Sequence, residues 1–264
     1  IIPTSPIKSD PKQKIDLNKK LTDLNELKIS HNNSKKYLNE ILINCNTDSL
    51  LVMHKGILVF EYFNNFTAYD TPHIIFSISK SLTSLLTGIL IDKNVINLNN
   101  LVSDVLPETI GTSYEDATIR NVLDMNVASN FVEDYSGEAE IFKKYRSSTG
   151  WDISSSKDEN ALTGLHDFLS NMPKSNYSHG KKYHYCSPHS DLLGWIIERT
   201  SGEKFPNIMS ELLFKPAGIN YEANITVDKL GAPRSAGGIS ITPYDLLLIS
   251  ELVRENGSNK NGQI

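Results

Sequence analysis

One Ser-x-x-Lys pattern holds the strongest candidates for chemistry in this sequence. The pattern occurs six times, beginning at Ser5, Ser9, Ser77, Ser154, Ser178 and Ser201. Only Ser77 opens a long amphipathic stretch, directly after the apolar residues 73–76. Positions i and i+3 share one face of a helix, so Lys80 can reach the hydroxyl of Ser77. The pattern therefore predicts Ser77 as a nucleophile with Lys80 as its proton acceptor.

Activation of Ser77 sets conditions on its surroundings. A serine hydroxyl is a weak nucleophile unless a base takes its proton. Lys80 can do so only if burial or a positive neighbour favours its neutral form. The partial positive charge and the N–H groups of the helix N-terminus would favour a developing oxyanion. The plainer alternative is a serine near a helix start with an exposed lysine in the first turn.

The segment 183–195 supplies two further candidates, Tyr185 and Ser187. A tyrosine just before a helix start can share a proton with a Ser–Lys pair, although a packed turn aromatic would look the same. Three histidines, His179, His184 and His189, recur every five residues nearby. That spacing does not align on a helix face and no acidic residue is in register, so we expect neither a metal nor a cofactor.

Local patterns predict one hairpin and three helices. Two short apolar runs flank Lys55-Gly56 and predict a β-hairpin over residues 49–63. Apolar residues at three- and four-residue spacing predict a helix over 77–91. A second helix is expected over residues 191–199, introduced by Ser187 as N-cap and Pro188 at N1, with Gly202 beyond its end. A third is expected over 243–255, with Thr242 as N-cap and Gly257 beyond its end.

The rest of the chain divides by composition. Residues 1–36 are polar and rich in lysine, and we expect an extended arm followed by a surface helix. Residues 37–264 are expected to form the main domain, with a mostly helical lobe over about 98–235. Two strands, a helical middle and a helical end favour an α+β fold.

Composition excludes several classes of protein. The 264 residues are 39% hydrophobic and 22% charged, which is typical of a globular protein. The net charge of −5 gives no electrostatic case for nucleic acid. No apolar run approaches the roughly 18 residues of a membrane span. Cys45 and Cys186 are too few for a disulfide framework, and both are expected to be free thiols. The compartment and the oligomeric state stay open.

Several segments, taken in order, resemble the serine β-lactamase and penicillin-binding superfamily, closest to class C enzymes and their esterase relatives. Residues 76–86 (FSISKSLTSLL) resemble its first motif, and 92–108 and 118–125 resemble the connection and helix that follow. Tyr185-Cys186-Ser187 stands where the family carries Tyr-x-Asn, and 236–239 (AGGI) resembles its later Gly-Gly turn. The similarity covers most of residues 48–257.

Within the superfamily, three segments look most like 6-aminohexanoate-dimer hydrolases, which are amidases with esterase activity on short nylon oligomers. These segments are Tyr185-Cys186-Ser187, residues 191–199 and residues 133–135. The resemblance implies a β-lactamase/transpeptidase-like fold with an antiparallel sheet flanked by helices. It also implies an acyl-enzyme on Ser77, with Lys80 and Tyr185 as proton-transfer partners, and a pocket that includes Ser187 and Tyr135.

The sequence departs from the family in two places. Ser187 replaces the usual asparagine, which argues against penicillin hydrolysis. The family's third motif, Lys-Thr-Gly or His-x-Gly, is missing, and we expect the closing strands of the sheet to be missing too. We therefore expect a serine hydrolase acting on a small amide or ester. The alternatives are a β-lactamase or D-Ala-D-Ala peptidase, or a non-catalytic binding protein with the same fold.

Overall fold

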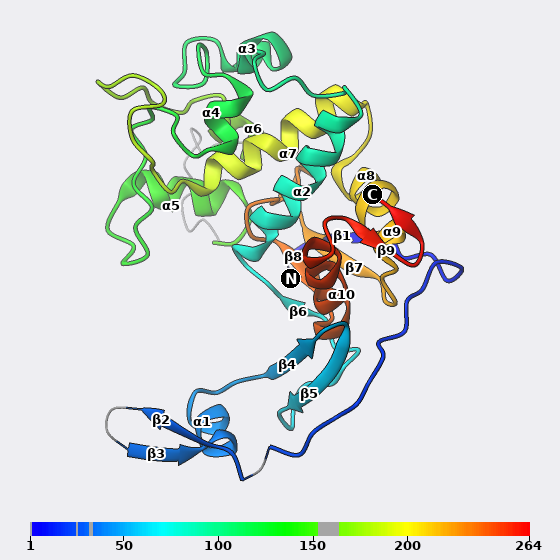
Figure 1. The fold of residues 1–264 in the computed structure, drawn as a ribbon. Coiled ribbons are helices and arrows are strands. Elements are labelled where there is room, and N and C mark those ends of the chain that lie inside the picture. The colour runs from blue at the N-terminus through cyan, green and yellow to red at the C-terminus, as the bar shows by residue number, and fades with distance from the viewer. Residues whose placement is uncertain (1, 25, 32–33, 153–163) are drawn as a thin grey trace. The chain divides into compact units, whose positions relative to one another are not determined.

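The computed structural model describes residues 2–24, 26–31, 34–152 and 164–264 and divides the chain into two units (Figure 1). The first unit, called the helical unit below, comprises Ile1–Lys8, Ile74–Leu213 and Asn224–Ser240. The second, called the hairpin unit, comprises Ser9–His73, Phe214–Ala223 and Ile241–Ile264. All five residues predicted for the site fall in the helical unit.

Most of the described helices fall in the helical unit. They are α2 (Ile78–Asp92), α3 (Val102–Val105), the 3-10 turn η1 (Pro107–Thr109), α4 (Ile119–Leu123), α5 (Glu140–Ser148), α6 (Leu165–Leu169), α7 (Ser187–Ser201) and α8 (Phe205–Met209). The strands that lie wholly or mainly in this unit are β1 (Thr4–Ile7), β7 (Ala223–Thr226) and β8 (Ile239–Ile241), and β6 (His73–Ile74) lies at its edge. The four strands form one sheet in the order β1-β7-β8-β6.

Helix α2 buries both an apolar row and a polar row. Leu82, Leu86 and Leu90 are almost fully buried, as the spacing predicts. The buried Thr87 hydroxyl donates to the carbonyl of Thr83 inside the helix. The buried Thr83 hydroxyl lies 3.0 Å from two carbonyl oxygens, that of Ser79 inside the helix and that of Ser235 outside it. The polar row leaves α2 with groups that can hold a neighbouring segment by hydrogen bonds.

Helix α7 is the buried centre of the helical unit. Every residue from Ser187 to Ile197 is buried, and the helix contacts α2, α3, α4, α6 and α8 (Figure 1). A helix that is enclosed on all sides needs an apolar surface nearly all round, which residues 192–197 supply. Gly202 ends the helix with φ of 72°, a left-handed conformation that glycine adopts freely.

The Gly-Gly turn leads into the pairing of β7 with β8, which lie antiparallel with Asn224 opposite Ser240. A Cβ on Gly238 would lie 2.2 Å from Thr226 Oγ1, so only glycine fits here. A Cβ on Gly237 would meet nothing closer than 3.8 Å. The two glycines therefore differ: Gly238 is required by close packing, whereas a Cβ at Gly237 would make only ordinary van der Waals contacts.

The hairpin unit holds the remaining elements. They are β2 (Lys28–His31), β3 (Ser34–Tyr37), α1 (Leu38–Asn44), β4 (Ser49–His54), β5 (Ile57–Phe63), α9 (Lys215–Ala217), α10 (Pro243–Arg254), β9 (Ser258–Asn259) and β10 (Gly262–Gln263), and the π-helical turn η2 (Ser210–Phe214) leads into α9. The predicted hairpin is confirmed as β4 and β5, joined by Lys55 and Gly56 with φ of 50° and 75°. Helix α10 is confirmed with Thr242 as N-cap, accepting from the N–H of Asp245.

Three expectations were wrong. Residues 1–36 contain strands but no helix among the described residues, because the lysine-rich stretch near residue 30 pairs as the ribbon β2–β3. Helix α7 begins at Ser187 with Cys186 as N-cap, not Ser187. The strands β7 and β8 were missed, so the described chain carries more sheet than a single hairpin. The division at residue 36 stays a prediction.

Among the described residues, no helix combines the length and the apolarity that crossing a membrane requires.

Candidate active site

Ser77 lies at the turn that starts α2. It is the N-cap residue, and Phe76 before it has φ of 42°, an unusual value for a bulky side chain. The N–H groups of Ile78, Ser79 and Lys80 donate to the carbonyls of residues 75, 76 and 77. These three N–H groups, which were expected to be free, are therefore already bonded.

Lys80 meets Ser77 as the spacing predicts. Its Nζ lies 3.0 Å from Ser77 Oγ and donates to the carbonyl of Ala236 at 2.7 Å. The lysine is 9% exposed, so it is held inside the helical unit and does not extend into water. The alternative of an exposed lysine in the first turn is wrong for this residue.

Tyr185 reaches the same oxygen from a turn 108 residues along the chain. Its hydroxyl lies 2.7 Å from Ser77 Oγ, and Lys80 Nζ lies 5.1 Å from the centre of its ring. A hydroxyl can both donate and accept, so a proton can pass either way between Tyr185 and Ser77. The structure thus brings the three predicted residues together at one oxygen.

Ser187 and Tyr135 meet at a third residue, Glu133. Ser187 donates to the Glu133 carboxylate through its N–H at 2.7 Å and its hydroxyl at 2.6 Å. Tyr135 donates to the same carboxylate at 2.5 Å and is 71% exposed. Burial and the Glu133 carboxylate raise the pKa of the Tyr135 phenol. A carboxylate at the start of α7 is favoured by the helix dipole, so Glu133 takes the place of a local cap.

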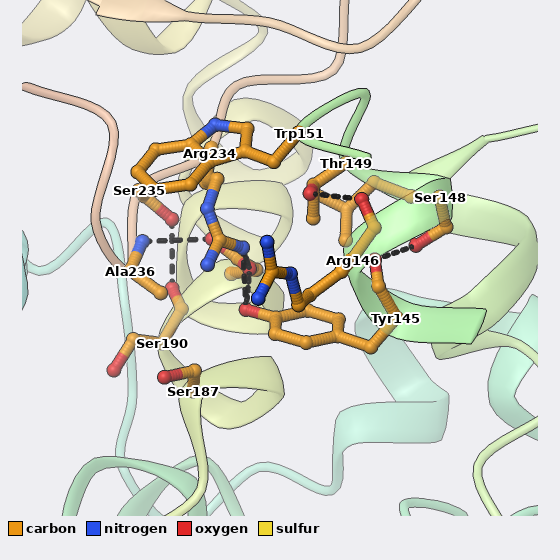
Figure 2. Close-up of polar contacts among 12 residues, drawn as sticks. Tyr145, Arg146, Ser148, Thr149, Trp151, Ser187, Ser190, Arg234, Ser235 and Ala236 are labelled. Atoms are coloured by element: carbon orange, nitrogen blue, oxygen red, sulfur yellow. Dashed lines mark hydrogen bonds and ion pairs between the residues drawn. The ribbon is translucent and has the colours of Figure 1, made fainter. Parts of the chain in front are cut away.

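Asp191, Arg234 and Tyr145 form a buried ionic group. Figure 2 shows Arg234 beside Tyr145. Asp191 accepts from the Tyr145 hydroxyl at 2.5 Å and lies 3.5 Å from an Arg234 nitrogen. Arg234 also donates to the Tyr145 hydroxyl at 2.8 Å. The second Asp191 oxygen accepts from the N–H of Ala236 at 2.7 Å. Ala236 therefore links Asp191 to Lys80.

Two opposing effects act on the pKa of the Asp191 carboxyl. Burial raises the pKa of the Asp191 carboxyl, and the Arg234 charge, the Tyr145 hydroxyl and the Ala236 N–H work against that rise. Arg234 lies 4.5 Å from the ring centre of Trp151, which covers it as Figure 2 shows. Its Nε is buried and has no hydrogen-bond partner among the described residues.

Apolar side chains border Ser77. Phe76 and Ile78 are 53% and 48% exposed although they flank the nucleophile position. Phe76 packs edge-on against Trp151 with ring centres 5.7 Å apart. Exposed apolar surface beside the Ser77 hydroxyl can accommodate an apolar group.

Sequence reasoning missed the roles of Glu133, Asp191, Arg234 and Ala236 in this geometry. Glu133, Asp191 and Ala236 were noticed only inside motifs of the resemblance, Asp191 also as the first residue of a predicted helix. The two cysteines are free, as expected, with Cys45 exposed and Cys186 buried. One of the six Ser-x-x-Lys patterns, at Ser154, lies outside the described residues.

The fold and the site define a class of protein. Residues 44–254 match the family model described as Beta-lactamase, so the chain belongs to the β-lactamase family. This places it in the β-lactamase-like hydrolase superfamily and confirms both the resemblance and the α+β fold.

One curated protein and two solved structures show how similar this chain is to individual relatives. The 6-aminohexanoate-dimer hydrolase of Paenarthrobacter ureafaciens is 30% identical over 218 residues, which are 83% of this chain and 54% of that protein. A solved structure from Bacillus anthracis, provisionally named a 6-aminohexanoate-dimer hydrolase, matches 99% of this chain and 68% of its own, with a TM-score of 0.91 and 21% identity. A penicillin binding protein from Bacillus halodurans matches 83% of this chain and 74% of its own, with a TM-score of 0.65 and 18% identity. The chain thus spans about half the length of the curated relative.

Proposed function

We propose that this protein is a serine hydrolase that cleaves small esters and amides through an acyl-enzyme on Ser77. One observation carries the proposal: Lys80 Nζ at 3.0 Å and the Tyr185 hydroxyl at 2.7 Å both contact Ser77 Oγ. These distances lie within the range that proton transfer requires.

The reaction divides into two acyl transfers. Ser77 Oγ attacks the substrate carbonyl while Lys80, in its neutral form, accepts the hydroxyl proton. Tyr185 delivers a proton to the departing amine or alcohol, and the acyl group stays on Ser77. Water then attacks the ester and gives a proton to the Tyr185 phenolate, the acid leaves, and Lys80 returns its proton to Ser77 Oγ. The backbone N–H of Ser77 is the donor we assign to the developing oxyanion.

Three features support amides and esters of small linear acids as substrates. The curated relative is named for the dimer of 6-aminohexanoate, a linear amide. The apolar border of Phe76 and Ile78 suits a methylene chain. Ser187 and Tyr135 meet at the Glu133 carboxylate, and in our proposal these side chains contact the substrate beyond its scissile bond.

The test is covalent labelling of Ser77. Intact-mass analysis after treatment with a fluorophosphonate or a reactive ester should show a single adduct, absent in Ser77→Ala. Ser79→Ala is the matched control, because Ser79 sits one residue on and its hydroxyl accepts from the N–H of Ile239. Labelling that persists in Ser77→Ala refutes the assignment.

Turnover assays separate the alternatives. A hydrolase of the proposed type releases p-nitrophenol from short-chain esters and cleaves the 6-aminohexanoate dimer, with little turnover of nitrocefin. Efficient nitrocefin hydrolysis would favour a β-lactamase instead. A protein that binds ligands but forms no adduct would be the non-catalytic alternative.

A further inference from the structure

We propose that Asp191 is a positioning residue that holds Lys80 in place for the reaction at Ser77 by fixing the backbone of Ala236. This inference rests on the proposed function. It concerns a buried carboxylate that contacts neither Ser77 nor Lys80 directly.

The hydrogen bonds form a continuous path. Asp191 accepts from the N–H of Ala236 at 2.7 Å, and the carbonyl of Ala236 accepts from Lys80 Nζ at 2.7 Å. Lys80 Nζ then lies 3.0 Å from Ser77 Oγ. The Ala236 carbonyl is the second contact that fixes the end of the flexible lysine side chain. A shift of that carbonyl would therefore change the position of Lys80 Nζ relative to Ser77 Oγ.

The segment that carries Ala236 is held from both sides. On the side of α2, Thr83 donates to the carbonyl of Ser235 at 3.0 Å. On the side of α7, the Ser235 hydroxyl donates to the carbonyl of Ser190 at 2.8 Å. The approach to α7 is close: a Cβ on Gly194 would lie 2.4 Å from Ser235 Oγ. These contacts fix Ser235. Among the described residues, Asp191 alone accepts from the N–H of the next residue, Ala236.

The carboxylate is itself held in one orientation. Its other oxygen accepts from Tyr145 at 2.5 Å, and Arg234 lies 3.5 Å away and balances its charge. A charged acceptor makes a hydrogen bond about twice as strong as a neutral one. Asp191 therefore holds the Ala236 N–H more firmly than an amide or hydroxyl would.

The experiment compares the reaction of Ser77 in two variants. Asp191→Leu removes the acceptor, and we expect the rate of fluorophosphonate labelling and the kcat for a p-nitrophenyl ester to fall about 50-fold or more, with KM changed less than twofold. Asp191→Asn keeps a neutral oxygen acceptor in the same shape. We expect it to restore most of the rate, to within about tenfold of the unsubstituted protein.

Asp245→Asn is the matched control. Asp245 is also fully buried and accepts backbone N–H bonds, from Asn220 and Tyr221, but it belongs to the hairpin unit. We expect it to lose stability while its labelling rate stays within twofold. Equal losses of rate in Asp191→Leu and Asp245→Asn would show a general structural effect, or none at all, and overturn the inference.

A second measurement decides the case if Asp191→Leu does not fold. In a Lys80→Met background, Asp191→Asn should cause no further loss of labelling rate, because the residue acts through Lys80. Additive losses would overturn the inference. Failure of the proposed function has a different signature, since the unsubstituted protein would then form no adduct at Ser77.

Discussion

At the scale of single residues, the candidate site is defined by the two groups that contact Ser77 Oγ. Ser77 Oγ has a buried amine on one side and a phenol on the other, and they come from segments far apart in the chain. The amine is enclosed, while Tyr185 remains 36% exposed. This difference suits a division of labour in which Lys80 takes the serine proton and Tyr185 passes one to a leaving group that departs toward solvent.

Tyr185→Phe tests that division. The substitution removes the phenol and keeps the ring beside Lys80. An amine must be protonated to leave, whereas p-nitrophenolate leaves without a proton. We therefore expect kcat for an amide substrate to fall about 100-fold or more and kcat for a p-nitrophenyl ester to fall much less. Tyr183→Phe, at an exposed tyrosine two residues away, is the control. Equal losses on both substrates would contradict this role.

The pair of glycines before β8 gives a second residue-scale prediction. Gly238→Ala places a methyl group 2.2 Å from Thr226 Oγ1, which is itself held by the Trp151 indole N–H. We expect the free energy of unfolding to drop by about 1–3 kcal/mol. Gly237→Ala makes only ordinary van der Waals contacts, the nearest at 3.8 Å, and should change the free energy of unfolding by less than about 0.5 kcal/mol. Tryptophan fluorescence in denaturant measures both, and similar losses in the two variants would contradict the packing described here.

At the scale of elements, local signals were enough for some features and not for others. Helices α2 and α10 and the hairpin β4–β5 were predicted because their apolar spacing, caps and turn lie within each segment. Short strands such as β7 and β8 were missed, since each depends on pairing with a distant segment. The start of α7 was misplaced for the same reason: its first N–H is satisfied by Glu133, 54 residues away.

The residues of the candidate site also differ in whether the sequence alone could identify them. The Ser77–Lys80 pair follows from spacing on one helix, so the sequence alone points to it. Tyr185 became a strong candidate only through the resemblance, because nothing local shows that its turn approaches α2. The contacts of Asp191 with Tyr145 and Ala236 span 46 and 45 residues, and no local pattern in the sequence predicts them.

Helix α7 carries a buried histidine that should make stability depend on pH. His189 is fully buried, with Nδ1 3.1 Å from the Tyr114 hydroxyl. Burial lowers its pKa from 6.5 to about 3. Between these values the unfolded chain binds a proton that the folded chain does not, so stability falls as pH falls. The loss from this residue is about 2 kcal/mol between pH 6.5 and pH 5.

His189→Asn should remove that part of the pH dependence. Both tryptophans lie in the helical unit, so their fluorescence in denaturant at each pH follows the relevant unfolding. His166, whose pKa burial lowers to about 4, contributes separately, so a smaller slope remains. His54→Gln, at an exposed position in the hairpin unit, is the control. An unchanged slope in His189→Asn would contradict the burial of a neutral imidazole.

At the scale of the whole molecule, the candidate catalytic residues all fall in one unit. Ser77, Lys80 and Tyr185 lie in the helical unit, and so do Asp191 and Arg234 behind them. The hairpin unit has its own aromatic cluster, in which Tyr69 stacks on Tyr244 with ring centres 5.5 Å apart. Each unit therefore has packing of its own, and each should have a measurable stability of its own.

The two cysteines report on the units separately. Cys45 is an exposed thiol of the hairpin unit, and Cys186 is a fully buried thiol of the helical unit whose pKa burial raises well above its ordinary value. The thiolate is the reactive form, and a buried thiol must first be exposed. In the native protein, N-ethylmaleimide should modify Cys45 rapidly, while Cys186 reacts only when the helical unit opens.

Mass analysis after timed labelling measures both rates in one sample. Under denaturing, non-reducing conditions two thiols should react, and finding none would show a disulfide and contradict the free cysteines. The Cys45→Ser variant leaves a single thiol, whose labelling rate then measures the opening of the helical unit alone. Because Cys186 adjoins Tyr185, a substrate acid that binds at Ser77 should slow that labelling. Native labelling of Cys186 as fast as that of Cys45 would show that the core around α7 is not closed as described.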